Sequence, residues 1–245
     1  MPTDPALLIF VKYPEPGKVK TRLAATIGAD LAAQLYEEFV RQTFKLAQQS
    51  RVATCFVTFT PAEKEAELKN LFPGVGQWFA QENSPDFGVR LQCAIQRVQQ
   101  QGYSSVITIG TDSPSLPAEY LDRAAAALAY NDLVLGPALD GGYYLIGLKS
   151  PPPTELFNGI DWSTERVLRQ TLQRAEQLRL SVYQLPVWYD VDDLVSLQKF
   201  CTENNLPPVL WQKVQSFLSN YLNTSAFAAT AASSNPTTSL KFTAP

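Results

Sequence analysis

Short apolar runs alternate with longer amphipathic segments over most of the chain. Runs at 6–11, 52–59, 77–80, 105–109 and 133–136 have the length and residue types of buried strands. Segments 28–49, 61–71 and 87–100 carry apolar residues at helical spacing. Strands that alternate with helices are typical of right-handed crossovers. The pattern therefore predicts an α/β fold of three layers, α/β/α and Rossmann-like, around a mostly parallel central sheet.

The regular alternation ends at the proline run 151–153. A helix over 163–177, a strand over 180–185 and two helices over 193–203 and 208–222 are expected after it. From residue 223 onward Ala, Ser and Thr dominate and charged residues are almost absent, which favours a disordered tail. We expect one domain over 1–222 and a low-complexity tail over 223–245.

The composition favours a cytoplasmic protein that acts on small molecules. The 245 residues are 45% hydrophobic and 18% charged, as in soluble globular proteins. A net charge of −3 and a pI of about 5.1 argue against a nucleic-acid partner. No run reaches the length of a membrane span, so no membrane partner is expected. The pattern does not predict an oligomeric state.

The chain contains no histidine, and this narrows the possible chemistry. Ser-His-Asp and Cys-His hydrolases are excluded, as is any metal site that requires imidazole. A metal must then be held by oxygen atoms. Mg²⁺ or Mn²⁺ bound by carboxylates is the leading cofactor class.

A basic loop follows the first predicted strand. Residues 12–22 carry four of the 20 Lys and Arg side chains, next to Pro14, Pro16 and Gly17. The loop is not a P-loop, because Val19 follows Gly17-Lys18 and position 12 is not glycine. Open α/β sheets bind ligands at the carboxyl ends of their strands, which favours phosphate binding over a merely solvated loop. The predicted phosphate-binding residues are Lys12, Gly17, Lys18, Lys20, Thr21 and Arg22.

Aspartates follow two later strands. Asp112 ends the run 107–111, and it is either a metal ligand or a turn or N-cap residue. Asp190 and Asp192 would share one face of an extended segment, which is costly unless a cation joins them. The alternative is that Asp192 or Asp193 caps the next helix.

The turn Asp140-Gly141-Gly142-Tyr143 has two interpretations. The glycines allow close approach of the backbone to a ligand, but the same sequence suits an ordinary hairpin. Tyr143 and Tyr144 should point to opposite faces, one to the core and one to a pocket. Three further residues are weaker candidates for the site. Asp86 is either a helix cap or, with Arg90, a nucleotide-binding residue. Trp162 lies just before a predicted helix.

In their joint order these segments resemble the GT-A-type nucleotide-diphospho-sugar transferase superfamily, and most closely a bacterial glycosyltransferase family associated with arsenosugar biosynthesis. The resemblance spans about 7–197 and rests on PEPGKVKTRL, IGTDSP, GPALDGGYY, WST and DVD. It implies that Gly17, Lys18, Lys20 and Arg22 hold nucleotide phosphates and that Asp112, Asp190 and Asp192 hold the metal. Asp140 would be the acid or base on the acceptor side, where Gly141, Gly142, Tyr143 and Trp162 would also lie.

Three functions remain open from the sequence. The first is a metal-dependent glycosyltransferase that moves a sugar from a nucleotide-diphosphate donor to a small acceptor. Glycosyltransferases of this fold commonly carry an Asp-x-Asp pair, whereas the segment at Asp112 has only one aspartate. The motif Asp-Ser-Pro-x-Leu-Pro also resembles a motif of guanylyltransferases. The second is therefore a nucleotidyltransferase that releases pyrophosphate from a nucleoside triphosphate, and the third is a non-catalytic nucleotide-binding module.

Overall fold

The computed structural model describes residues 5–149, 151, 153–203, 206–217 and 219. Its contacts divide the chain into two compact units, Met1–Asn205 and Leu206–Pro245. In the second unit residues 208–217 are helical, and the predicted tail over 223–245 lies outside the described residues. The sheet, its helices and the candidate site all belong to the first unit.

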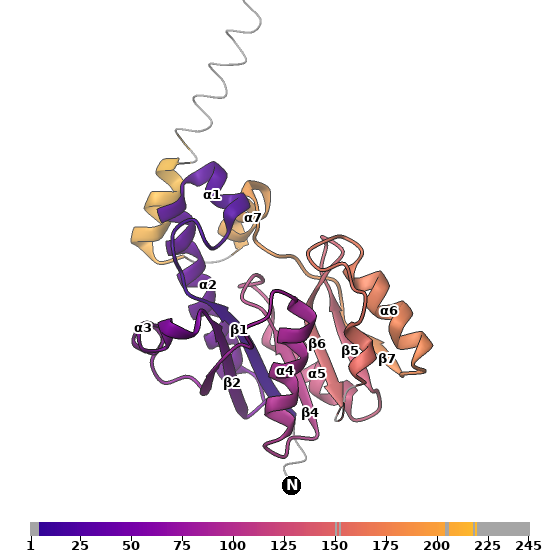
Figure 1. Cartoon of the computed structure of the whole chain (residues 1–245). Coiled ribbons are helices and arrows are strands. Elements are labelled where there is room, and N and C mark those ends of the chain that lie inside the picture. Colours follow the sequence, from indigo (N-terminus) through magenta and orange to yellow (C-terminus); the bar gives the residue numbers. More distant parts are fainter. Residues whose placement is uncertain (1–4, 150, 152, 204–205, 218, 220–245) are drawn as a thin grey trace, which may run out of the picture. The chain divides into compact units, whose positions relative to one another are not determined.

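A seven-stranded sheet forms the centre of the first unit (Figure 1). The strand order is β3-β2-β1-β4-β6-β5-β7, and among these strands only β6 runs antiparallel to its neighbours. This confirms the predicted α/β fold with a mostly parallel sheet. The strands are β1 (Ala6–Lys12), β2 (Thr54–Thr60), β3 (Gln77–Ala80), β4 (Ser105–Ile109), β5 (Leu133–Pro137), β6 (Tyr143–Lys149) and β7 (Val182–Gln184).

The helices begin and end close to the predicted positions, with two differences. The helix expected over 28–49 is present from Ala29, but a further short helix that was not predicted precedes it, separated by Gly28 at φ 87°. The helix expected from 163 begins at 167, because Ser163 has φ 63° and cannot continue a right-handed helix. The helices are α1 (Thr21–Ile27), α2 (Ala29–Gln49), α3 (Glu65–Leu71), α4 (Phe87–Gln99), α5 (Ala118–Leu128), α6 (Val167–Gln177) and α7 (Leu194–Glu203), with 3₁₀ turns at Ala62–Lys64 and Thr154–Phe157.

Two hydrophobic cores cover the two faces of the sheet. Successive residues of β1 alternate between them: Leu7 and Ile9 join one core, and Ala6 and Leu8 join the other. Helices α2, α3 and α5 contribute to the first core, and α4 and α6 contribute to the second. Both faces of the central strands are therefore buried, which explains why those strands are continuous apolar runs.

Strand direction places the candidate residues at one edge of the sheet. β1, β4, β5 and β7 run in the same direction, because β6 reverses the chain between β4 and β5. The loops that follow these four strands carry the basic residues, Asp112, Asp140 and the pair Asp190 and Asp192, respectively. The carboxyl edge of an open α/β sheet is where ligands bind.

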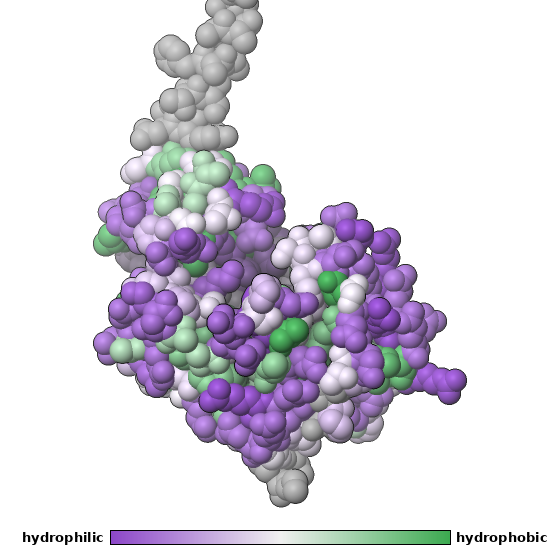
Figure 2. Space-filling view, in the orientation of Figure 1, coloured by the Kyte–Doolittle hydropathy of each residue, from purple (hydrophilic) through white to green (hydrophobic). Residues whose placement is uncertain are grey.

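The surface in the orientation of Figure 2 consists mainly of hydrophilic residues. Within the described part of the chain, no helix combines the length and the apolarity that crossing a membrane requires.

Candidate active site

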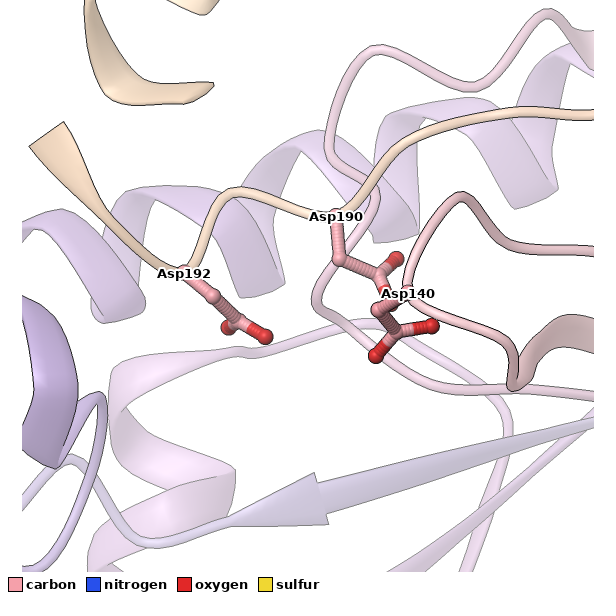
Figure 3. Close-up of side chains that lie close together, drawn as sticks. All are labelled: Asp140, Asp190 and Asp192. Carbon is pink, nitrogen blue, oxygen red and sulfur yellow. The ribbon is translucent and has the colours of Figure 1, made fainter. Parts of the chain in front are cut away.

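Three carboxylates meet beside the loop that follows β5. Asp140, Asp190 and Asp192 each offer a carboxylate oxygen, and these three oxygens lie within 4.8 Å of one another (Figure 3). We call these residues the acid cluster. They line a cavity of about 320 Å³, here called the acid cavity. An all-oxygen set at this spacing matches the ligand preference of Mg²⁺ or Mn²⁺.

Asp140 is positioned by a tight turn. Its Oδ1 accepts a hydrogen bond from the Gly142 N–H at 2.9 Å, and the Ala138 N–H closes the turn onto the Gly142 carbonyl at 3.0 Å. Gly141 has φ 89°, and a Cβ there would lie 2.3 Å from the carbonyl oxygen of Glu165. The need for glycine at position 141 is therefore explained by the close approach of the backbone that precedes α6, and the predicted place of Gly141 on the acceptor side stays a prediction.

Asp190 is held against the loop that follows β4. The Ser113 hydroxyl donates to Asp190 Oδ1, and the Val191 N–H donates to the Asp112 carbonyl at 2.8 Å. Burial, followed by the nearby charge of Asp112, raises the pKa of Asp190 to about 7. Without a bound cation, Asp190 therefore holds its proton to a higher pH than an ordinary aspartate does.

This raised pKa predicts a pH-dependent stability. Because the folded-state pKa lies above the unfolded value of about 4, the proton favours the folded state, and stability is lost as the pH rises from about 4 through 7. Asp190→Asn removes this loss and keeps an acceptor for Ser113. In the presence of a chelator, we expect the melting temperature of the variant to be about 4–8 °C above that of wild type at pH 8. Near pH 4 the two melting temperatures should be similar. Equal melting temperatures at pH 8 would refute the assignment.

Lys20 joins the two acidic segments. Its ammonium contacts Asp112 Oδ1 and lies 2.8 Å from Asp192 Oδ1, and its side chain is only 3% exposed. Burial works against the charged lysine, but the two carboxylates outweigh it and raise the pKa of Lys20. Desolvation likewise opposes the ionised Asp112, yet Lys20 holds the pKa of Asp112 below its usual range. The structure thus pairs Asp112 with a lysine and leaves it outside the acid cluster.

The other predicted phosphate ligands are less constrained. Lys12 and Lys18 are exposed, and Gly17 turns the loop at φ 78°. Thr21 is the first residue of α1, but the N-cap position belongs to Lys20, which makes no side-chain capping bond. The remaining cation, Arg22, is 68% exposed, lies 3.8 Å from Asp193 Oδ2 and lines the acid cavity.

A second cavity, of about 360 Å³, opens beside the end of β1; we call it the β1 cavity. The end of β1, the basic loop, the loop that follows β4, and α4 all contribute to its walls. Its lining residues are Phe10, Val11, Lys12, Val19, Lys20, Tyr36, Gln81, Phe87, Arg90, Gly110, Thr111, Asp112 and Ser163. Lys20 and Asp112 therefore stand between the β1 cavity and the acid cluster.

Arg90 and Asp86 have different roles at α4. Asp86 caps the helix, since its Oδ1 accepts from Gly88 N–H at 2.7 Å. Arg90 donates to the Ser84 carbonyl at 2.7 Å, while its Nε is buried without a hydrogen-bond partner among the described residues. Arg90 also lines both the β1 cavity and an adjoining cavity of about 390 Å³. Of these two residues, Arg90 is the one available to a ligand.

Two residues expected on the acceptor side, Tyr143 and Trp162, are half-buried and pack against the second hydrophobic core. The rings of Tyr143 and Trp162 lie 6.5 Å apart, centroid to centroid, and Trp162 also packs edge-on against Phe87. Tyr143 and Tyr144 face opposite sides of the sheet and pack against different hydrophobic cores, and both also line a small cavity of about 60 Å³ together with Asp112, Ser113 and Asp190. Trp162 therefore supports the start of α4 rather than the acid cavity.

Tyr36, Ser113 and Ser163 are site residues that the sequence analysis missed. The Tyr36 hydroxyl accepts from the Lys12 N–H at 2.8 Å and from the Thr111 hydroxyl at 3.0 Å, so it ties the ends of β1 and β4 together. Ser163 lines the β1 cavity in a left-handed conformation. Tyr36 lies within a helical apolar pattern, which gave no signal beyond a core position.

Comparisons with known proteins place the chain in a family. The family model described as "Uncharacterized protein conserved in bacteria (DUF2064)" matches residues 43–164. A structure from Desulfovibrio desulfuricans G20, described as a "putative nucleotide-diphospho-sugar transferase", is 33% identical, with a TM-score of 0.80 over 89% of this chain and 98% of that one. No curated protein sequence matches the chain.

More distant structures share the fold. The Mycobacterium tuberculosis H37Rv protein Rv0371C, in complex with manganese, is 13% identical with a TM-score of 0.54, over 82% of this chain and 100% of that one. The 4-diphosphocytidyl-2C-methyl-D-erythritol synthase of Anaerococcus prevotii DSM 20548 is 9% identical with a TM-score of 0.56, over 82% and 96% of the two chains. The family model and the close Desulfovibrio relative together show that the chain belongs to the DUF2064 family.

Proposed function

We propose that the protein is a divalent-cation-dependent glycosyltransferase that moves a sugar from a nucleotide-diphosphate donor to a small-molecule acceptor. One observation carries the proposal: the basic loop and the acid cluster meet at the carboxyl edge of the sheet, joined through Lys20. Cations suit the diphosphate, and carboxylates suit the metal that such a diphosphate carries. The description of the Desulfovibrio relative names the same class of enzyme.

In this proposal the β1 cavity receives the nucleotide. Lys12, Lys18 and Arg22 are exposed cations at this edge of the sheet, and in this proposal they would face the phosphates. The unpartnered Nε of Arg90 would donate to the nucleotide from the wall that the β1 cavity shares with its neighbour. Because this buried N–H has no hydrogen-bond partner among the described residues, a ligand or water that accepts its hydrogen bond would be stabilised at this wall of the β1 cavity.

The acid cluster would hold Mg²⁺ or Mn²⁺ through Asp140, Asp190 and Asp192. When bound, such an ion neutralises charge that develops on the departing diphosphate. We assign Asp140 first to this role, because its carboxylate lies with the other two acids. Its exposed position in the acid cavity also faces the space left for the acceptor, which it would orient.

A nucleotidyltransferase that releases pyrophosphate is the second candidate. The fold shared with 4-diphosphocytidyl-2C-methyl-D-erythritol synthase favours it, because phosphate-binding and metal-binding groups at this edge suit a nucleoside triphosphate equally well. The two reactions differ in which bond breaks, and hence in the product that leaves.

Product analysis tests the proposal. The protein is incubated with Mn²⁺ and either nucleotide sugars or nucleoside triphosphates, each with a panel of polyols, sugars and hydroxy acids. We expect a nucleoside diphosphate to be released from a nucleotide sugar in an acceptor-dependent manner. Pyrophosphate from a triphosphate would instead establish the second candidate. Metal-independent binding without either product would indicate a non-catalytic binding module.

A further inference from the structure

Lys20 lies where a cation would bridge the two acidic segments. Its ammonium contacts Asp112, in the loop that follows β4, and Asp192, which lies 172 residues after Lys20 in the sequence. Asp192 is also a member of the acid cluster. The lysine is thus the direct link between the strand-end carboxylate and the three acids that fit a divalent cation.

The backbone and the surroundings of Lys20 commit its side chain to this position. The residue has φ 45° and ψ 47°, a left-handed conformation that is strained for any residue other than glycine. The ammonium lies 5.6 Å from the centre of the Phe39 ring, and the side chain is 3% exposed. A lysine that only bound phosphates from solvent would need neither the strained backbone nor the burial.

The charges around Lys20 explain what it balances. Asp112 and Asp192 contact it directly, and Asp190 is close enough to Asp112 for that charge to raise its pKa. Two other cations, Arg22 and Lys199, line the acid cavity, but Arg22 is largely exposed and lies beside Asp193, and Lys199 lies over the Tyr189 ring. The exposed Lys12 acts on Asp112 only through its charge. Several carboxylates gathered in a partly buried site repel one another strongly unless a cation is present.

We propose that Lys20 is an internal counter-ion that balances Asp112 and Asp192 while the acid cluster holds no divalent cation, and that such a cation takes over this balance when it binds. The proposal rests on the proposed function only for the presence of a divalent cation at the cluster. It gives Lys20 a positioning role, in place of the phosphate contact that its place in the basic loop predicted.

Thermal unfolding of the metal-free protein, in chelator and at low ionic strength, tests the first half. Lys20→Met is expected to lower the melting temperature by about 5–10 °C, because it leaves paired carboxylates without their cation. Adding Asp112→Asn to Lys20→Met is expected to restore much of that loss. Lys18→Met, an exposed lysine of the same loop, is the matched control and should melt like wild type.

Addition of Mn²⁺ tests the second half. The ion should raise the melting temperature of Lys20→Met more than that of wild type, and the variant should bind Mn²⁺ several-fold more tightly in an electron paramagnetic resonance titration. If Lys20→Met does not fold in chelator, the double variant with Asp112→Asn is used, and recovery of folding supports the counter-ion role.

Three results would overturn the proposal: metal-free Lys20→Met that melts like wild type, failure of Asp112→Asn to restore stability, or a Mn²⁺ shift no larger in the variant than in wild type. None of these measurements involves a nucleotide or turnover. Absence of any transferase product would therefore count against the proposed function while leaving the role of Lys20 to be decided by the melting and titration data.

Discussion

A protein that carries both Asp140→Asn and Asp192→Asn is expected to bind Mn²⁺ at least roughly 100-fold more weakly than wild type. The physical reason is the loss of two of the three carboxylates whose oxygens lie within 4.8 Å of one another. Even partners that only support a metal ligand are worth roughly 10- to 100-fold in affinity, and direct ligands should exceed this. Electron paramagnetic resonance of free Mn²⁺, or isothermal titration, measures the change.

The matched control for this double variant is Asp193→Asn. Asp193 lines the same acid cavity but lies outside the acid cluster, and its Oδ1 caps α7 by accepting from the Ser196 N–H at 2.8 Å. Asparagine caps a helix about as well as aspartate, so the control should keep its stability and its Mn²⁺ affinity. Equal Mn²⁺ affinities in the double variant and the control would show that the acid cluster is not the metal site.

Gly141→Ala is expected to destabilise the fold by about 3 kcal/mol or more and to weaken Mn²⁺ binding with it. The new Cβ would lie 2.3 Å from the Glu165 carbonyl oxygen, and the backbone there holds φ 89°, which an alanine rarely adopts. Relief of the clash must move either the turn that positions Asp140 or the segment before α6. Chemical denaturation and Mn²⁺ titration follow the two effects.

Gly17→Ala provides the comparison for Gly141→Ala. Gly17 has φ 78°, similar to Gly141, but among the described residues no atom beyond its chain neighbours lies within 4 Å of the place that a Cβ would take. It should lose only the backbone contribution, about 1 kcal/mol. A loss as large in Gly17→Ala as in Gly141→Ala would mean that backbone conformation, rather than close approach to Glu165, sets the need for glycine at position 141.

The fold was largely predictable because its signals are local. Apolar runs of strand length and the turn after Pro137 specify which segments form strands, and strand direction then brings the loops to one edge. Two local features were missed: the short helix α1 before Gly28 and the late start of α6, which follows Ser163 with its positive φ. Ser163 is not a glycine and carries no composition signal for that conformation.

The sequence predicted which residues belong to the candidate site better than it predicted which of them contact each other. Charge and strand-end position singled out Lys20, Asp112, Asp140 and Asp192. Which of them touch depends on contacts between loops that are far apart in sequence, such as the one between Lys20 and Asp192. The charge of the basic loop assigned Lys20 to phosphates, and the family resemblance implied a metal role for Asp112, but neither indicated that the two residues pair with each other as they do in the structure.

The surroundings of Gly141 and Trp162 likewise depend on contacts that the sequence pattern does not specify. A glycine-rich acidic turn is compatible with a nearby ligand or a nearby chain, and only the three-dimensional path of 163–167 shows that the chain approaches Gly141. An aromatic residue before a helix is likewise compatible with a pocket or a core. The ring contacts of Trp162 with Phe87 and Tyr143 place it in the core.

We propose that the acid cluster and the basic edge of the sheet bind a divalent cation and a nucleoside diphosphate together. Measuring the affinity for Mn²⁺ with and without nucleotide tests this most directly. ADP, CDP, GDP and UDP are each added to wild type and to the Asp140→Asn/Asp192→Asn variant, with correction for Mn²⁺ bound to nucleotide in solution. When two ligands bind next to each other and one raises the affinity for the other, the effect is reciprocal and has the same factor in both directions. We expect at least one diphosphate to raise the Mn²⁺ affinity of wild type roughly tenfold and to have no such effect on the variant. An unchanged affinity with all four nucleotides, or an equal gain in the variant, would contradict the account.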